Sequence, residues 1–167
     1  GGERWAQYSI IGLDCRDTIK VSGNKIEIKT DLISNSFESS DPLNELNKII
    51  NNYQSPDIED MPRFYGGYVG FFAYESAQYA EAKIKSLQKK DSKFDEHMPD
   101  IYLVKSEKLI VYDNFDKSIK VIYNSDPLKT PYEEAIKQLN EIENCIDFLK
   151  EYNHPLINGS GHEQTWT

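Results

Sequence analysis

The sequence has few of the residues that build metal or redox centres. Of its 167 residues, two are cysteines and three are histidines. Cys15 and Cys145 lie far apart in the sequence, with no histidine or lysine close beside them, so they form no metal-binding or redox motif. His97, His154 and His162 stand in polar stretches, where a solvated surface histidine is expected. We therefore predict no catalytic residue and no metal site, and we expect both cysteines to be small buried hydrophobic residues.

Basic clusters and long apolar runs are also missing. The net charge is -9, which repels a phosphate backbone, and Lys89-Lys90 is the densest basic pair. No apolar run approaches the ~20 residues of a membrane span, and no charged-then-apolar leader opens the chain. We therefore expect no nucleic-acid partner, no membrane and a reduced, cytoplasmic setting. The length suits about one domain.

Three of the nine glycines lie in one segment, PRFYGGYVGFFAYE at residues 62–75. Its Gly-Gly pair and the apolar run that follows predict a tight turn leading into a strand that is buried on both faces. Because glycine weakens a strand, Gly66, Gly67 and Gly70 indicate places where another backbone or a ligand approaches closely. They do not open a helix after a strand, as a phosphate-binding loop does.

The other elements follow from periodicity and turn residues. Alternating residues flank Ser22-Gly23-Asn24, a hairpin signal. Asp41 can cap a helix that has Pro42 at its first position. Thr130 opens a capping-box pattern before a second apolar stripe. The predicted strands are residues 6–13, 17–21, 25–29, 67–74, 101–104, 108–112 and 118–123; the predicted helices are 42–53, 76–88 and 132–149.

These elements predict an α+β fold, a largely antiparallel sheet with helices packed on one face. The strand at 67–74 has no polar alternation, so both of its faces need cover. Two or three helices can cover only one face of such a sheet. We therefore expect the other face to be an exposed apolar surface suited to docking on a partner.

Three segments, in this order, carry a family resemblance. They are RWAQYSIIG at residues 4–12, the segment at 62–75, and residues 98–114, which begin MPDIYL and end IVYDN. Together they resemble the N-terminal domain of the anthranilate synthase component I family, chorismate-utilising enzymes that begin tryptophan synthesis. Gln7 stands where the family usually has arginine. The resemblance implies that residues 1–152 are this domain, truncated at its start, and that 153–167 are a linker towards an absent chorismate-binding domain.

In the family, the absent domain holds chorismate, magnesium and the acid–base residues, and it makes most of the contact with glutamine amidotransferase component II. The resemblance therefore implies that this chain is inactive alone and docks on that domain. It also implies L-tryptophan as a possible effector. Tyr8 and Ser9 are the only positions here that match near the family's tryptophan pocket, and the alternative for both is a packed strand end.

Two other interpretations stay open. Aminodeoxychorismate synthase component I, of folate synthesis, shares the Gly-Gly-Tyr-Val-Gly style of strand. The chain could instead be a free-standing module that binds a small aromatic molecule in its Tyr- and Phe-rich sheet. Tight, saturable tryptophan binding by the chain alone would favour such a module, because half a pocket leaves buried charged groups unpaired.

Overall fold

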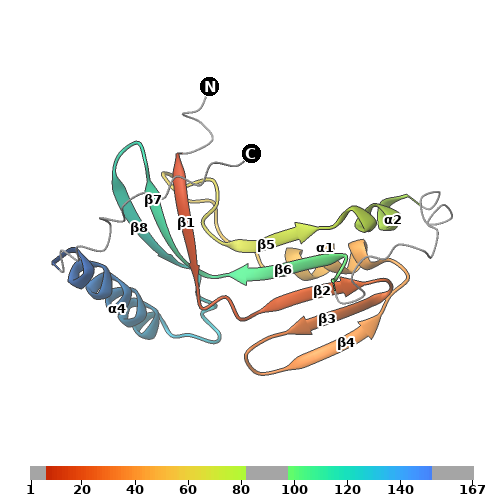
Figure 1. Ribbon diagram of the computed structural model, residues 1–167. Coiled ribbons are helices and arrows are strands. Elements are labelled where there is room, and N and C mark those ends of the chain that lie inside the picture. Colours follow the sequence, from red (N-terminus) through yellow and green to blue (C-terminus); the bar gives the residue numbers. More distant parts are fainter. Residues whose placement is uncertain (1–6, 82–97, 152–167) are drawn as a thin grey trace, which may run out of the picture. The chain divides into compact units, whose positions relative to one another are not determined.

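The computed structural model describes residues 7–81 and 98–151 (Figure 1). Within them, the strands form a five-stranded sheet of order β4-β3-β2-β6-β5 and a three-stranded sheet of order β1-β7-β8, and all pairings are antiparallel. This confirms the α+β class, although two sheets replace the one expected. The strands are β1 (Tyr8–Leu13), β2 (Thr18–Ser22), β3 (Lys25–Lys29), β4 (Ser34–Glu38), β5 (Gly67–Phe72), β6 (Ile101–Ser106), β7 (Lys108–Asp113) and β8 (Ser118–Tyr123).

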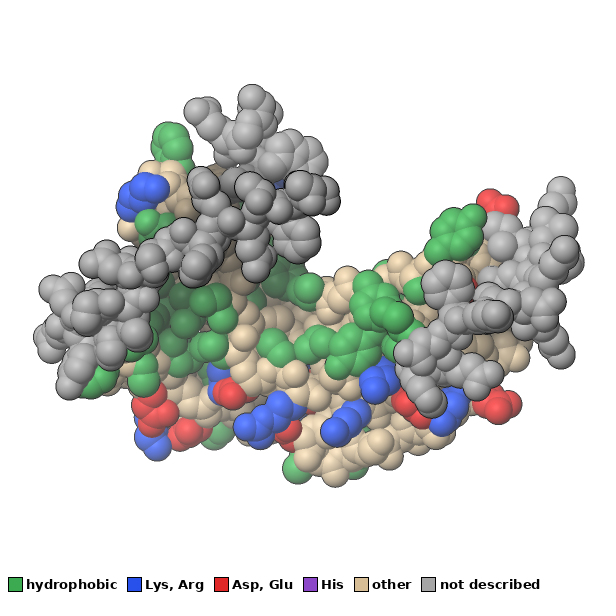
Figure 2. Space-filling view, viewed as in Figure 1, with side chains coloured by type: hydrophobic (Ala, Val, Ile, Leu, Met, Phe, Trp, Pro, Cys, Tyr) green, Lys and Arg blue, Asp and Glu red, His purple; other side chains and the backbone are tan. Residues whose placement is uncertain are grey.

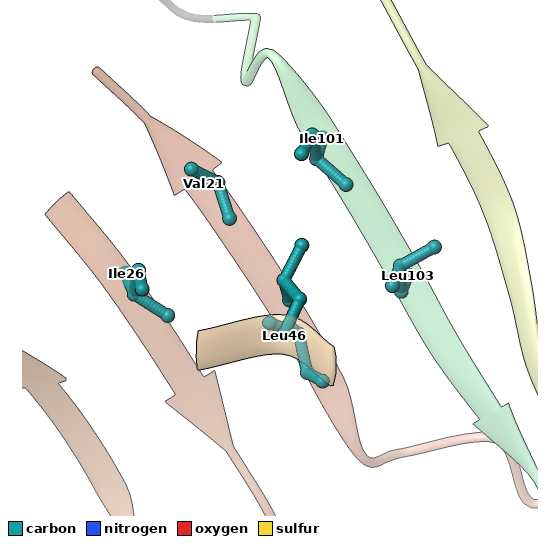
Figure 3. Packing of buried hydrophobic residues seen from close by; sticks show 6 residues of the cluster. Val21, Ile26, Leu46, Ile101 and Leu103 are labelled. Carbon is teal, nitrogen blue, oxygen red and sulfur yellow. The ribbon is translucent and has the colours of Figure 1, made fainter. Parts of the chain in front are cut away.

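Helices cover one face of the five-stranded sheet. Helix α1 (Pro42–Asn51) lies behind this sheet in Figure 1. Its Leu46 packs into a buried cluster with alternate residues of β2, β3 and β6, and Tyr79 of the short helix α2 (Ala77–Ala80) packs against the same cluster. Figure 3 shows Leu46 of α1 over the strand residues of this cluster, and the contact of Tyr79 places α2 against the same face, which confirms helices on one face. The buried members are Ile19, Val21, Ile26, Leu46, Ile101 and Leu103.

The three-stranded sheet has a second, smaller core. Leu109, Val111 and Ile122 are buried on one face of β7 and β8. The loop that precedes β5 covers this face with Met61, Phe64 and Tyr65. The same loop therefore covers the buried face of the three-stranded sheet and then continues into the five-stranded sheet as β5.

The local signals for α1 operate as predicted. The Asp41 carboxylate accepts a hydrogen bond from the Asn44 backbone N–H at 3.2 Å, and Pro42 is the first helical residue. Gly23 has φ of 58° in the turn between β2 and β3, the left-handed conformation that glycine adopts freely. The predicted hairpin is thus confirmed.

The two later helices were predicted over residues 76–88 and 132–149. A 3₁₀ turn, η1 (Tyr74–Ser76), leads into α2, which ends at Ala80 because the backbone of Glu81 is extended; this corrects the prediction of one helix running from 76 through that point, and residues 82–88 lie outside the described residues. Helix α4 (Tyr132–Glu151) confirms the last prediction and belongs to a second compact unit that begins at Pro127. The predicted linker at 153–167 also lies outside the described residues.

Candidate functional site

The face of the five-stranded sheet opposite α1, here called the outer face, is the candidate site. Successive strand residues point to opposite faces, so the neighbours of the buried cluster residues line this face. Val69 lies opposite Val104, and Phe71 lies opposite Tyr102, with ring centroids 6.1 Å apart. Val69 is 51% exposed. Figure 2 shows hydrophobic side chains gathered over β5 and β6 on this side of the sheet.

Away from β5 and β6, the outer face becomes polar. Lys20 of β2 pairs with Tyr102 on one side and with Glu27 on the other. Its Nζ lies 5.5 Å from the centroid of the Tyr102 ring, within cation–π range. Ser36 of β4 follows Glu27 across the next strand pair. The outer face is therefore apolar towards β5 and charged towards β4.

β5 is an edge strand, which corrects the expectation that both of its faces are buried. Val69 on the outer face and Phe72 on the α1 side are 51% and 55% exposed. The apolar run of this strand predicted burial on both faces, but Val69 and Phe72 are about half exposed, and of the strand's residues only Tyr68 packs against the buried cluster. This matches the expectation of an exposed apolar surface and extends it to the edge of the sheet.

Of the three glycines expected to allow a close backbone approach, only Gly70 has a close backbone neighbour; a Cβ added to Gly66 would meet the Asn124 side chain, and one added to Gly67 would meet nothing closer than the Phe64 ring at 3.9 Å. A Cβ added to Gly70 would lie 1.9 Å from the backbone oxygen of Tyr102, so only glycine fits beside β6 there. Gly66 and Gly67 have φ of 149° and 122° where the chain bends into β5. The Asn124 side-chain amide holds this bend by donating a hydrogen bond to the Tyr65 carbonyl at 2.5 Å.

Tyr8 and Ser9 point to opposite faces of the three-stranded sheet, because they are neighbours on β1. Tyr8 is half-buried and packs against the Leu109 cluster. Ser9 is exposed, and its hydroxyl accepts a hydrogen bond from the Asn114 amide at 3.2 Å. The structure therefore keeps the two side chains on different faces, and their proposed contact with tryptophan stays a prediction.

Asp113 ends β7 and holds the following turn. Its Oδ1 accepts hydrogen bonds from the backbone N–H groups of Phe115 at 2.8 Å and Asp116 at 3.2 Å. Its Oδ2 accepts one from the side chain of Gln7 at 3.3 Å. Burial raises the pKa of Asp113, but these hydrogen bonds and Lys120 outweigh it and hold the pKa below its ordinary value. Gln7, the departure from the family pattern, is thus tied to the Asp113 turn.

A buried lysine on β6 was missed by sequence reasoning. Lys105 is 8% exposed, and its Nζ lies 3.6 Å from the centroid of the Tyr53 ring and 2.5 Å from Glu107 Oε1. Tyr68, opposite Lys105 on β5, meets the edge of the Tyr53 ring. Burial raises the pKa of Tyr68 well above its ordinary value, and Tyr53, Asp17 and Glu107 add to that rise. The strand pattern of β6 gave no signal for a buried charge at this position.

The described residues contain no group of three or more histidine, cysteine or acidic side chains that could hold a metal ion. All three histidines lie outside those residues. Cys15 is half-buried, and its thiol lies 3.6 Å from Ser106 Oγ. Cys145 is exposed, which corrects the expectation of burial, because its place on α4 lies beside the apolar stripe rather than in it. Across the part of the chain that the structure describes, no helix has the length and apolar character to span a membrane.

Comparison with known proteins identifies relatives of this chain. No protein-family model matches the chain. It is 35% identical over 144 residues to anthranilate synthase component 1 of Pseudomonas aeruginosa, covering 85% of this chain and 29% of that protein. It is 32% identical over 168 residues to the protein of the same name from Neisseria meningitidis serogroup B, covering 98% and 33%.

The chain therefore spans about a third of the length of the curated relatives it matches. Among solved structures, anthranilate synthase component I from Streptococcus pneumoniae superposes with a TM-score of 0.64 and 22% sequence identity. The superposition covers 86% of this chain and 30% of that one. It shows that the two share a fold.

Proposed function

Since the chain is homologous to the N-terminal ~30% of anthranilate synthase component 1 over most of its length, we propose that it is the N-terminal, non-catalytic part of such an enzyme. The parent protein converts chorismate and an ammonia donor, glutamine or ammonium, to anthranilate and pyruvate in the cytoplasm. The fragment alone is inactive. The observation that carries this proposal is the alignment of nearly the whole chain with one third of the relative from Neisseria meningitidis.

The geometry supports a docking role for this part. The outer face presents Val69, Phe71, Tyr102 and Val104 as one apolar strip on β5 and β6. Such a strip is typical of a surface that another protein layer covers. In the proposed parent, the covering layer is its own chorismate-binding domain.

The described residues do not fit the proposed parent's magnesium ion, because they bring together no set of carboxylate, imidazole or thiol ligands. No magnesium-dependent step is therefore assigned to this chain. Magnesium, the catalytic residues and most of the contact with glutamine amidotransferase component II belong, in this proposal, to the rest of the parent protein.

Product identity tests the proposal against its nearest alternative. The full-length parent is given chorismate, magnesium and ammonium, and the products are separated and identified by mass. Anthranilate and pyruvate are expected. Aminodeoxychorismate would instead assign the parent to folate synthesis, although the relatives from Pseudomonas and Neisseria that match this chain are both named anthranilate synthase.

Tryptophan binding separates the fragment from a free-standing binding module. Tyr8 and Ser9, the proposed tryptophan contacts, lie on opposite faces of β1, so the chain alone offers at most half of a pocket. Unpaired buried groups of the ligand would cost about 1–3 kcal/mol each. Calorimetric titration of the 167-residue chain with tryptophan is expected to give no saturable heat, whereas tight binding would favour the module.

A further inference from the structure

The outward edge of β5 is a feature of the fold that the proposed function has not used. Within the described residues, β5 pairs only with β6, and β4 at the other end of the sheet pairs only with β3. On an edge strand, alternate backbone N–H and C=O groups point away from the sheet without a ladder partner. Among the residues that the structure describes, no strand therefore occupies either outer edge of the five-stranded sheet.

The two edges differ in how they are protected. β4 reads SNSFE, with polar side chains and a terminal Glu38. β5 reads GYVGFF and contains no charged residue and no proline. Natural proteins usually guard an exposed edge with charge, proline or a bulge, because an apolar edge pairs with other chains. By this criterion β4 is an edge strand protected against pairing, here called the guarded edge, and β5 is an unprotected edge strand.

The side chains of β5 place apolar groups beside its edge on both faces of the sheet. Val69 is exposed on the outer face, beside Phe71 and the strip on β6. Phe72 is exposed on the opposite face. A strand laid along this edge would therefore find apolar neighbours on both faces of the sheet, which is how added strands gain specificity beyond their backbone hydrogen bonds.

We propose that the edge of β5 pairs with an extended, apolar segment of the parent polypeptide that lies outside these 167 residues, so that the five-stranded sheet gains one more strand. This inference rests on the proposed function. The chain covers 29% and 33% of its relatives from Pseudomonas and Neisseria, so a parent of that length has ample chain to supply the strand. A second copy of this chain is a poorer occupant, because a net charge of -9 on each copy opposes their association.

Residue-resolved amide hydrogen exchange tests this pairing. In the isolated chain, at a dilution where it is monomeric, we expect alternate amides of residues 67–72 to be protected and the intervening amides to exchange freely. In the full-length parent we expect the intervening amides to slow by at least about ten-fold. The proposal is overturned if these amides stay unprotected in the parent. The proposal is also overturned if the intervening amides become protected when the isolated chain dimerises, because β5 would then pair with a second copy of the chain.

A matched pair of substitutions sharpens the test. Val69→Lys places a charge on the β5 edge, and Ser36→Lys places the same charge on the outer face of the guarded edge strand β4. In the parent, V69K should restore fast exchange to the intervening β5 amides and lower the Tm, whereas S36K should change neither. In the isolated chain both variants should leave the Tm unchanged. If V69K lowers the Tm of the isolated chain and of the parent equally, Val69 stabilises the chain itself rather than the pairing, and the proposal is overturned.

The amide measurement needs no enzymatic activity, so the two proposals fail separately. A parent that makes another product sinks the proposed reaction, and the β5 amides still report whether the edge is paired. Unprotected β5 amides in an active parent sink the pairing alone.

Discussion

At the scale of single residues, β6 makes two close contacts, one with a glycine and one through a buried lysine. Gly70 lets the backbone of β5 approach the Tyr102 carbonyl, and Lys105 places a charge against the Tyr53 ring. Asp113 has a comparable role in the other sheet, where its carboxylate organises a turn. Each contact predicts a measurable effect of one substitution.

Gly70→Ala should destabilise the chain because the new Cβ would lie 1.9 Å from a backbone oxygen, which cannot move without shifting β6. Overpacking of this kind costs about 1–3 kcal/mol. Gly12→Ala is the control, since its nearest neighbours, Cys15 Sγ and Ser106 Oγ at 2.7 Å, are side-chain atoms that can rotate away. Urea unfolding should show the larger loss for G70A, and equal losses would contradict this account.

The contact of Lys105 with Tyr53 should appear as a coupling free energy. In a double-mutant cycle of Lys105→Met with Tyr53→Leu, we expect about 0.5–2 kcal/mol of coupling in the free energy of unfolding. Tyr53→Phe keeps the ring and should leave the effect of K105M almost unchanged. A cycle that couples equally with phenylalanine and leucine at position 53 would show that the ring face is irrelevant.

Asp113 predicts a dependence of stability on pH. Its pKa is lowered in the folded chain, so its stabilising effect is complete above the unfolded-state pKa of about 3.9 and is lost as the pH falls through the folded-state value. Asp113→Asn should therefore be less stable than the native chain at pH 7, and the gap should shrink below about pH 4. Asp116→Asn, at an exposed position in the same turn, is the control. A gap that is constant between pH 7 and pH 3 in urea unfolding would refute the assignment.

At the scale of elements, capping explains where α1 begins. The Asp41 side chain satisfies the Asn44 N–H, one of the helix's unpaired donors. Asp41→Ala should cost about 0.5–2 kcal/mol of stability. Asp57→Ala, in the exposed loop after α1, should change it by less than about 0.5 kcal/mol. Thermal unfolding of the two variants measures the difference. Indistinguishable Tm values would show that the Asp41 cap does not stabilise the chain.

The elements also mark how far the sequence can predict this fold. Hairpin residues around Gly23 and the cap at Asp41 act locally, so they identify β2, β3 and α1 without tertiary information. β4 was not predicted, because SNSFE has one apolar residue and owes its structure to pairing with β3. The division of the strands between two sheets was not predicted either, since periodicity says which residues are strands but not which strands pair.

For the candidate site, the apolar run of β5 predicted that other residues cover this strand. It did not predict whether those residues belong to this chain or to a partner. Alternation cannot tell a buried central strand from an edge strand that a partner covers, because both are apolar on two faces. The buried charge of Lys105 had no pattern to reveal it. Tyr8 and Ser9 came from family resemblance alone, and the strand geometry that separates their side chains is visible only in the structure.

At the scale of the whole molecule, the apolar strip, the unpaired edge of β5 and the length of the relatives support the proposal that this chain is one part of a longer protein. The described residues form two cores, and they contain no group of three or more histidine, cysteine or acidic side chains that could hold a metal ion. We infer that the role of these residues is to build and support a partner surface, and that the reaction takes place elsewhere in the parent.

One activity measurement on two proteins tests whether the isolated chain lacks the catalytic machinery. The purified 167-residue chain and the full-length parent, at equal concentrations, are each given chorismate, magnesium and ammonium, and the fluorescence of anthranilate is followed. The account predicts anthranilate from the parent and none from the chain alone. Anthranilate formed by the isolated chain would contradict it.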